Sequence, residues 1–226
     1  VSVIPGLGGR SGSATYKGRE LLRKVGEPGA WVPDEGGYEE YTESGYRSPG
    51  WFEQYRVTAK SERSITLEAN LKNGLRVSRT IELAADKPSV RIRTTATNPE
   101  GAARSAALRV HPEYAVACTA NCEVRLLGAD GKWATIDCAN PADPLAEKEQ
   151  WLTTDNVRGA WAMVDKGADI ALVNRFDTDQ VERLLLNHSG SKSRVNLELF
   201  GKQTSLNAGE SAALEHTLEI VPAGSL

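Results

Sequence analysis

Apolar residues at every second position are the feature that most constrains how this chain folds. They flank an Asn73-Gly74 pair on both sides, at Ile65, Leu67, Ala69, Leu71, Leu75, Val77, Ile81 and Leu83. Successive side chains of a β-strand point to opposite faces, and an Asn-Gly pair favours a tight turn between two strands. Residues 64–83 are therefore predicted to form a β-hairpin.

The same two-residue period recurs along the rest of the chain. It predicts strands within residues 86–98, 101–116, 123–136, 159–176, 193–200 and 211–221, with turns at Asp130-Gly131 and Lys166-Gly167. The only segment compatible with a helix is short, residues 143–152. Because about a dozen strands follow from this pattern, we expect an all-β protein built from antiparallel strands.

The length of 226 residues fits one large all-β domain or two small ones. No internal repeat and no low-complexity linker divides the chain, so we predict a single sandwich domain over residues 1–226. The chain begins at Val1, in what the pattern indicates is the middle of a strand. We therefore expect a processed protein or a fragment of a longer chain.

Residues 26–56 differ from the rest, because they are rich in Gly and Pro and show no alternation. They hold two of the five Trp and four of the six Tyr residues. A loop of this length inside a compact domain is usually functional. Two interpretations stay open: the aromatic rings stack on the faces of sugars, or they form a flap that seals one end of the sandwich.

The charges exclude some classes of partner. The chain carries 27 basic and 30 acidic residues, well mixed, for a formal net charge of −3. It has no basic patch of the kind that binds nucleic acid or an anionic membrane surface. No apolar run approaches the roughly 20 residues that cross a bilayer, and the first ten residues lack the basic-then-apolar order of a signal peptide.

The three cysteines, Cys118, Cys122 and Cys138, lack the paired spacing of a zinc site. We predict neither a metal site nor a cofactor. One disulfide with a spare thiol would suit a secreted or periplasmic protein, and three thiols would suit a cytoplasmic one. The sequence does not choose between the two, and we favour export.

Three segments, taken in order, carry a family resemblance. Residues 4–22 (IPGLGGRSGSATYKGRELL) hold a Gly-Gly-Arg turn and a G-x-E-L-L hairpin. Residues 93–116 (RTTATNPEGAARSAALRVHPEYAV) hold an Asn near a strand end and then a His-Pro motif. Residues 195–221 (VNLELFGKQTSLNAGESAALEHTLEIV) hold a strand glutamate and an L-x-x-G-E-S turn. In this order they resemble the galactose mutarotase-like (aldose 1-epimerase-like) proteins.

The resemblance implies a two-sheet antiparallel β-supersandwich. That fold occurs in aldose 1-epimerases, in hexose-6-phosphate epimerases and in non-catalytic sandwich domains of glycoside hydrolases and lyases. The resemblance therefore implies a mono- or oligosaccharide ligand on the open sheet face more firmly than it implies catalysis. The alternative is a non-catalytic structural sandwich that packs against a neighbouring glycoside hydrolase or lyase catalytic domain in a longer chain.

Strand alternation places the candidate acid–base residues. In residues 108–114 (LRVHPEY) the apolar residues face the core, so Arg109 and His111 point to the opposite face. In residues 195–200 (VNLELF) the apolar residues also face the core, and Glu198 points away from it. Mutarotation needs a base for the anomeric hydroxyl and an acid for the ring oxygen. By their places in the family motifs, Glu198 resembles the base and His111 the acid. Arg109 is expected to orient a hydroxyl or a phosphate of the substrate.

Three tryptophans, Trp31, Trp51 and Trp161, are expected to flank this face and to bind the sugar. The sequence departs from the galactose-type pattern, which has a second active-site histidine upstream of the first, because no histidine precedes His111. The remaining histidines, His188 and His216, are expected to be structural. Whether the domain is an enzyme or a binding module stays open.

Overall fold

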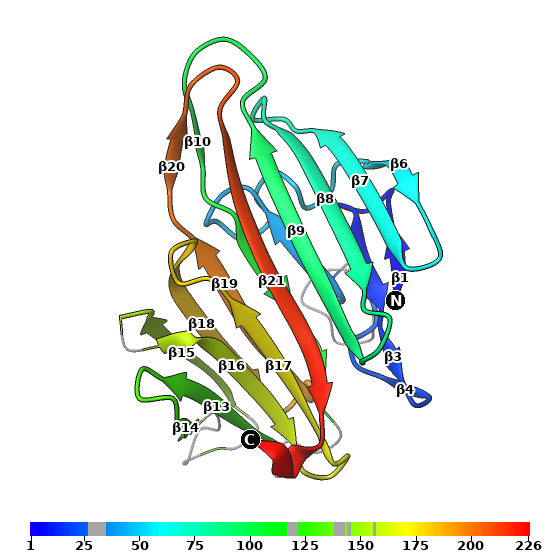
Figure 1. Cartoon of the computed structure of the whole chain (residues 1–226), viewed down its shortest axis with the longest axis vertical. Coiled ribbons are helices and arrows are strands. Elements are labelled where there is room, and N and C mark those ends of the chain that lie inside the picture. Colours follow the sequence, from blue (N-terminus) through cyan, green and yellow to red (C-terminus); the bar gives the residue numbers. More distant parts are fainter. Residues whose placement is uncertain (27–34, 117–121, 138–142, 144–145, 156) are drawn as a thin grey trace.

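Two antiparallel sheets build the molecule, and the larger lies in front of the smaller in Figure 1. The computed structural model describes residues 1–226 except 27–34, 117–121, 138–142, 144–145 and 156. The described residues form strands β1 to β21 and one short 3-10 helix, η2 (Ala223–Ser225). No helix in this part of the chain is long and apolar enough to span a membrane.

The eight-stranded sheet carries the candidate site. In spatial order its strands are β1 (Ser2–Ile4), β2 (Arg10–Ser13), β5 (Tyr38–Tyr41), β11 (Arg109–Pro112), β19 (Arg194–Gly201), β18 (Val181–Ser189) and β15 (Glu147–Thr153), with β12 (Tyr114–Ala115) also paired to β19. Segments that are far apart in the sequence therefore become neighbours at its centre, where β11 lies between β5 and β19.

The nine-stranded sheet covers one face of the first. In spatial order it contains β14 (Trp133–Ile136), β13 (Cys122–Gly128), β16 (Val157–Asp165), β17 (Ile170–Phe176), β21 (Ser211–Val221), β9 (Ser89–Thr97), β8 (Arg76–Leu83), β7 (Ser64–Asn70) and β6 (Arg56–Lys60). Two small ladders pair β3 (Thr15–Tyr16) with β4 (Arg19–Glu20), and β10 (Arg104–Ala106) with β20 (Thr204–Leu206).

The predicted all-β sandwich and its hairpins are confirmed. Strands β7 and β8 pair around the Asn73-Gly74 turn, where Gly74 has a φ of 81°, a left-handed conformation that favours glycine. The turns after β13 and β16 also lie where the alternation predicts them, at Asp130-Gly131 and Lys166-Gly167.

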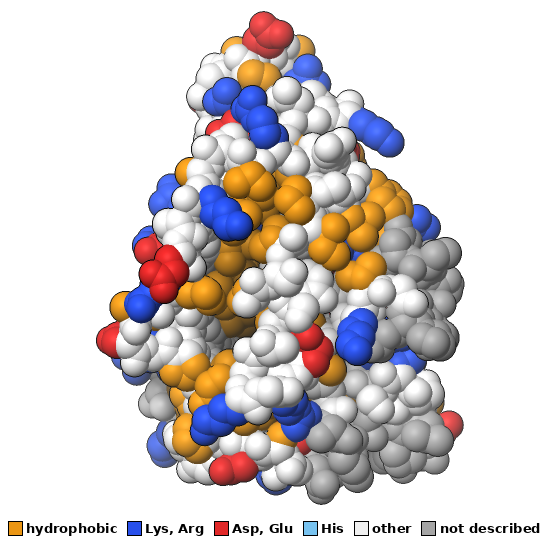
Figure 2. All heavy atoms as spheres, turned by 90° about the vertical axis from the view of Figure 1, so that its right-hand side faces the viewer, with side chains coloured by type: hydrophobic (Ala, Val, Ile, Leu, Met, Phe, Trp, Pro, Cys, Tyr) orange, Lys and Arg blue, Asp and Glu red, His pale blue; other side chains and the backbone are white. Residues whose placement is uncertain are grey.

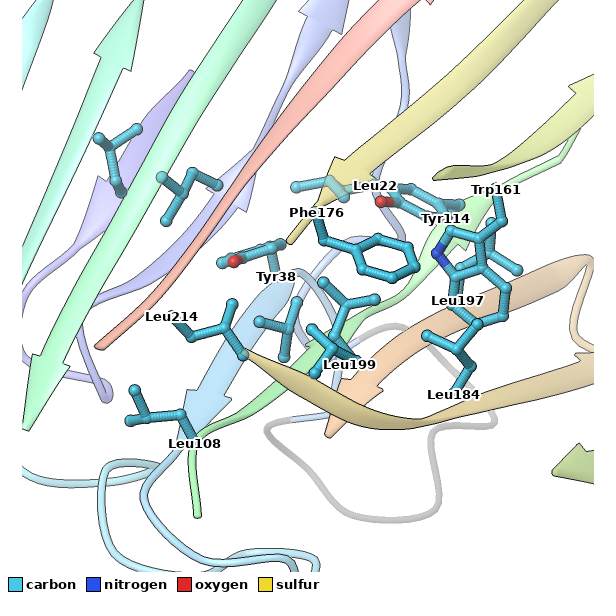
Figure 3. Packing of buried hydrophobic residues seen from close by; sticks show 14 of the residues in the cluster. Leu22, Tyr38, Leu108, Tyr114, Trp161, Phe176, Leu184, Leu197, Leu199 and Leu214 are labelled. Carbon is cyan, nitrogen blue, oxygen red and sulfur yellow. The ribbon is translucent and has the colours of Figure 1, made fainter. Parts of the chain in front are cut away.

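The hydrophobic core fills the space between the two sheets (Figure 3). Leu184, Leu197 and Leu199 enter it from the eight-stranded sheet, and Trp161 and Phe176 enter it from the nine-stranded sheet. Side chains therefore alternate along β19 as predicted: its leucines point into the core, and Glu198 points to the opposite face.

Two segments differ from what the sequence alone indicates. Residues 147–153, which fall largely within the segment compatible with a helix, form strand β15 paired with β18, because pairing along a whole strand outweighs the helix propensity of Glu, Lys and Gln. The segment 26–56, read as one long loop, contains strand β5, whose four residues are all buried.

Strand β5 is buried although it carries a charge on each face. On the core side, Glu40 forms an ion pair with Arg79 at 3.0 Å, and the Tyr38 and Thr94 hydroxyls donate to the same carboxylate. Glu40 and Arg79 are exposed by 3% and 1%. A buried charge is tolerated only when it is paired and hydrogen-bonded, as Glu40 is here.

The position of Trp161 gives a stability prediction. Trp161 is 0% exposed and Trp151 is 50% exposed, so replacing each with alanine should lower the free energy of unfolding by different amounts. We expect Trp161→Ala to lower the free energy of unfolding by about 3–5 kcal/mol and Trp151→Ala to lower it by less than about 1 kcal/mol. Urea denaturation followed by circular dichroism measures both, and equal losses would contradict the assignment of Trp161 to the core.

Candidate functional site

Two cavities differ sharply in chemistry. One, of about 320 Å³, opens between the sheets and is lined mainly by apolar side chains such as Leu21, Ile92 and Leu218. Figure 2 shows hydrophobic side chains gathered around a hollow on the side that carries β6 and β7. The other cavity, of about 570 Å³, is lined by His111, Glu198 and further polar residues on the non-core face of the eight-stranded sheet. The second cavity places a histidine beside several glutamates, the side chains best suited to acid–base chemistry near neutral pH.

Strand register brings His111 and Glu198 together at the floor of the polar cavity. Val110 pairs with Leu199 across β11 and β19, and the next residue pair in that register is His111 with Glu198. The imidazole Nε2 lies 3.5 Å from Glu198 Oε1. On the other side, His111 pairs with Glu39 of β5, and its Nδ1 lies 3.6 Å from Glu39 Oε2.

Glu198 is held by Arg109. The Arg109 Nε and Nη2 atoms donate to Glu198 Oε2 at 2.7 and 2.6 Å, which leaves Oε1 facing His111. Arg109 also donates to the Ser44 carbonyl oxygen at 3.0 Å. Burial raises the pKa of Glu198 to about 7, although the Arg109 charge opposes this rise. Glu198 therefore gains and loses its proton near neutral pH.

His111 is neutral at physiological pH. Its side chain is buried, and burial holds its pKa well below the ordinary value of 6.5, with Arg109 and Arg194 adding to the effect by charge repulsion. Asn196, two residues before Glu198 on the same face, places its Nδ2 3.3 Å from His111 Nε2. The imidazole thus lies among two carboxylates and an amide.

An ion-pair network forms the wall of the cavity around Arg194. Its guanidinium contacts Glu35 at 2.6 Å, Glu147 at 2.9 Å and the Asn187 Oδ1 atom at 3.1 Å. Glu113 lies 3.6 Å away, and burial raises its pKa to about 7. The arginine is therefore surrounded by carboxyl groups on several sides.

An aromatic side chain covers the histidine. The Tyr46 ring lies 5.3 Å from the His111 ring and lines the cavity. Trp51 packs behind Tyr46 at 5.8 Å and is 1% exposed, with the Arg47 guanidinium 3.9 Å above its ring. Trp51 therefore supports the aromatic wall from behind, and Tyr46 is the ring that faces the cavity.

The structure brings together only part of the predicted site. Arg109, His111 and Glu198 meet as expected, but they lie buried at a cavity floor and not on a solvated face. Trp161 points into the core between the sheets, away from this cavity, and Trp31 lies outside the described residues.

Sequence reasoning missed several residues that line the cavity or lie beside it. Asn196 and Arg194 lie two and four positions before Glu198, so alternation along β19 was the signal that could have found them. Glu39 and Tyr46 belong to the segment without alternation, which offered no such signal. Among the described residues, no cluster of three or more His, Cys, Asp or Glu side chains could hold a metal ion.

Comparison with known proteins supports the fold. No protein-family model and no curated protein matches the chain. Among solved structures, the Slr1438 protein from Synechocystis sp. PCC 6803 is 13% identical, with 97% of this chain and 91% of that chain covered and a TM-score of 0.75. A galactose mutarotase-like protein from Lactobacillus casei is 16% identical, with 96% of each chain covered and a TM-score of 0.67.

A third match shows the same fold within a longer chain. A TPR-domain containing protein from Parabacteroides distasonis is 15% identical, with 99% of this chain but 46% of that chain covered and a TM-score of 0.73. Galactose mutarotase-like proteins recur among further matches. The chain therefore has the galactose mutarotase-like β-supersandwich fold, and at these identities the likeness concerns the fold alone.

The raised pKa of Glu198 gives a prediction for stability against pH. Its pKa rises from an ordinary 4.5 to about 7 on folding, so its contribution to stability is complete below pH 4.5 and is lost as the pH rises through 7. Glu198→Gln removes this dependence. Between pH 5 and 7 the stability of the variant relative to wild type should therefore rise, with a slope of up to about 1.4 kcal/mol per pH unit.

Urea denaturation at pH 5, 6, 7 and 8 measures this difference. Glu182→Gln makes the same chemical change at a half-exposed position of β18 and serves as the control, with an expected flat difference from wild type. A flat or falling difference for Glu198→Gln would contradict the assignment.

Proposed function

We propose that this domain binds an aldose in the polar cavity and interconverts its anomers. The observation that carries the proposal is the 3.5 Å contact between His111 Nε2 and Glu198 Oε1 at the cavity floor. Ring opening needs an acid and a base that reach two oxygens bonded to the same carbon, and two such groups a few ångströms apart fit that need. The shared fold with galactose mutarotase-like proteins adds support.

The pair needs one proton between its two members. Near neutral pH that proton resides on Glu198, because burial raises the pKa of Glu198 and lowers the pKa of His111. In ring opening, His111 Nε2 takes the anomeric hydroxyl proton while Glu198 gives its proton to the ring oxygen. Closure on the other face of the carbonyl returns both protons. These first-step roles are the reverse of those that the family resemblance implied.

The cavity has other features of a sugar site. Its volume of about 570 Å³ lies within the range of small-molecule pockets. Polar side chains dominate the lining, and the buried Asn196 Oδ1 atom has no hydrogen-bond partner among the described residues. The Tyr46 ring offers an apolar face of the kind that stacks on a pyranose. A sugar hydroxyl donating to Asn196 would remove the cost of that unpaired oxygen.

The alternative is a structural domain that packs against a catalytic domain in a longer chain. The apolar hollow between the sheets favours it, because large exposed apolar surfaces commonly mark protein contacts (Figure 2). The polar cavity on the non-core face of the eight-stranded sheet has no role in that alternative. A wild-type protein that neither accelerates anomer exchange nor shows shift changes in sugar titrations would support the structural domain.

Exchange NMR on the anomers of glucose and galactose tests the proposed activity. We expect wild type to accelerate exchange over buffer, and Glu198→Gln and His111→Asn to lower kcat by about 10²- to 10⁴-fold, the usual contribution of a positioned acid or base. Glu182→Gln, which carries the same change as Glu198→Gln outside the cavity, should match wild type. Full activity in both site variants would contradict the proposal.

A further inference from the structure

We propose that Glu39 is a positioning residue for His111: it holds the imidazole with the proton on Nδ1, so that the unprotonated Nε2 faces Glu198 and the sugar. The catalytic consequence rests on the proposed function. The orientation of the imidazole does not, because it follows from contacts within the folded chain. The two can therefore be tested apart.

Strand register places Glu39 beside His111. Glu39 and His111 are direct partners in the register of β5 and β11, on the face that bears the cavity. Glu39 Oε2 lies 3.6 Å from His111 Nδ1, and both side chains are almost fully buried. A neutral imidazole has one N–H donor, and a carboxylate beside one nitrogen fixes the proton there. A movement of a few tenths of an ångström closes the gap to a hydrogen bond.

Glu39 is itself held in place by its neighbours. The Arg10 Nη1 atom lies 2.7 Å from Glu39 Oε1, and the Tyr41 hydroxyl donates to Oε2. Arg10 is held in turn by the carbonyl oxygens of Leu7 and Gly36. Arg10 and the Tyr41 hydroxyl both present donors to Glu39, so its oxygens are held as acceptors, and Oε2 is the one that faces His111.

Two donor groups face the other nitrogen of the ring. Asn196 Nδ2 and Glu198 Oε1 lie 3.3 and 3.5 Å from His111 Nε2. An amide N–H and a protonated carboxyl both donate, and each fits an Nε2 without a proton. The imidazole therefore lies between the carboxyl groups of Glu39 and Glu198, and each of these is bound by its own arginine, Arg10 and Arg109.

Glu39 also stabilises the charge that the proposed reaction creates. When Nε2 takes the anomeric proton, His111 becomes an imidazolium in a buried site. The Glu39 carboxylate then faces the protonated ring at Nδ1. A carboxylate in this position orients the ring and stabilises its charged form without itself taking the proton.

Long-range ¹H–¹⁵N spectra of ¹⁵N-histidine-labelled protein at pH 7.5 test the orientation directly. The chain has three histidines, and the His111 signals are those missing from a His111→Gln sample. We expect wild-type His111 to be the tautomer protonated at Nδ1. A wild-type spectrum showing the proton on Nε2 would overturn the inference, whatever the variants do.

Glu39→Gln provides the second measurement. A glutamine has one oxygen, and the Arg10 charge holds it, so the NH₂ group faces Nδ1 and should move the ring proton to Nε2. Glu43→Gln, an exposed position outside the cavity, is the matched control and should leave the spectrum unchanged. An unchanged tautomer in Glu39→Gln would also overturn the inference.

Kinetics separate this inference from the proposed function. We expect Glu39→Gln to lower kcat by about 10- to 100-fold, part of the roughly 10²- to 10⁴-fold that a positioned acid or base supplies, with KM within about twofold because Glu39 is not among the cavity-lining residues. An inactive wild type with the Nδ1 tautomer would refute the activity and keep the inference. An active wild type with the Nε2 tautomer would keep the proposed activity and refute the role of Glu39.

Discussion

The register of three strands determines the site. Strands β5, β11 and β19 come from separate parts of the sequence, and their pairing puts Glu39, His111 and Glu198 in one row across the sheet. A slip by one residue would turn every side chain to the other face. The core prevents this, because Val110 and Leu199 are buried between the sheets and hold β11 and β19 in register. Hydrophobic packing on one face thus fixes the chemistry on the other.

The second constraint is the cost of buried charge. The carboxylates of the row are buried, and each is paired with an arginine from a neighbouring position, Arg10 for Glu39 and Arg109 for Glu198. Burial and pairing act in opposite directions on the pKa, and for Glu198 burial prevails. Burial of these charges lowers the stability of the fold, and the same burial keeps a proton available on Glu198 near neutral pH.

Sequence patterns predicted those parts of the fold that alternation governs. The hairpin of β7 and β8 and the inward leucines of β19 follow from a two-residue period that burial on one face imposes. The pattern fails where both faces are polar and buried, as in β5, whose glutamates form ion pairs with arginines distant in the sequence. It fails again in β15, because pairing with β18 overrides local helix propensity.

In the candidate site, too, local sequence patterns predict some features, and contacts between distant strands determine the others. His111 and Glu198 were predicted because each follows an alternating apolar pattern and lies in a motif that resembles a known family. Their burial, and the contribution of Glu39, depend on contacts between strands that no local pattern encodes. Fold comparison adds the β-supersandwich but no residue roles, since the similar structures share few residues with this chain.

We propose that His111 and Glu198 act as one proton-sharing pair within a sugar site. Titration with an aldose of protein labelled with ¹⁵N-histidine and ¹³C-glutamate, followed at the His111 Nε2 and Glu198 Cδ signals, tests this most directly. We expect both signals to shift together with one Kd, while the signals of His216, which lies between the sheets, stay in place. Shifts absent from both nuclei, or confined to one of them, would contradict it.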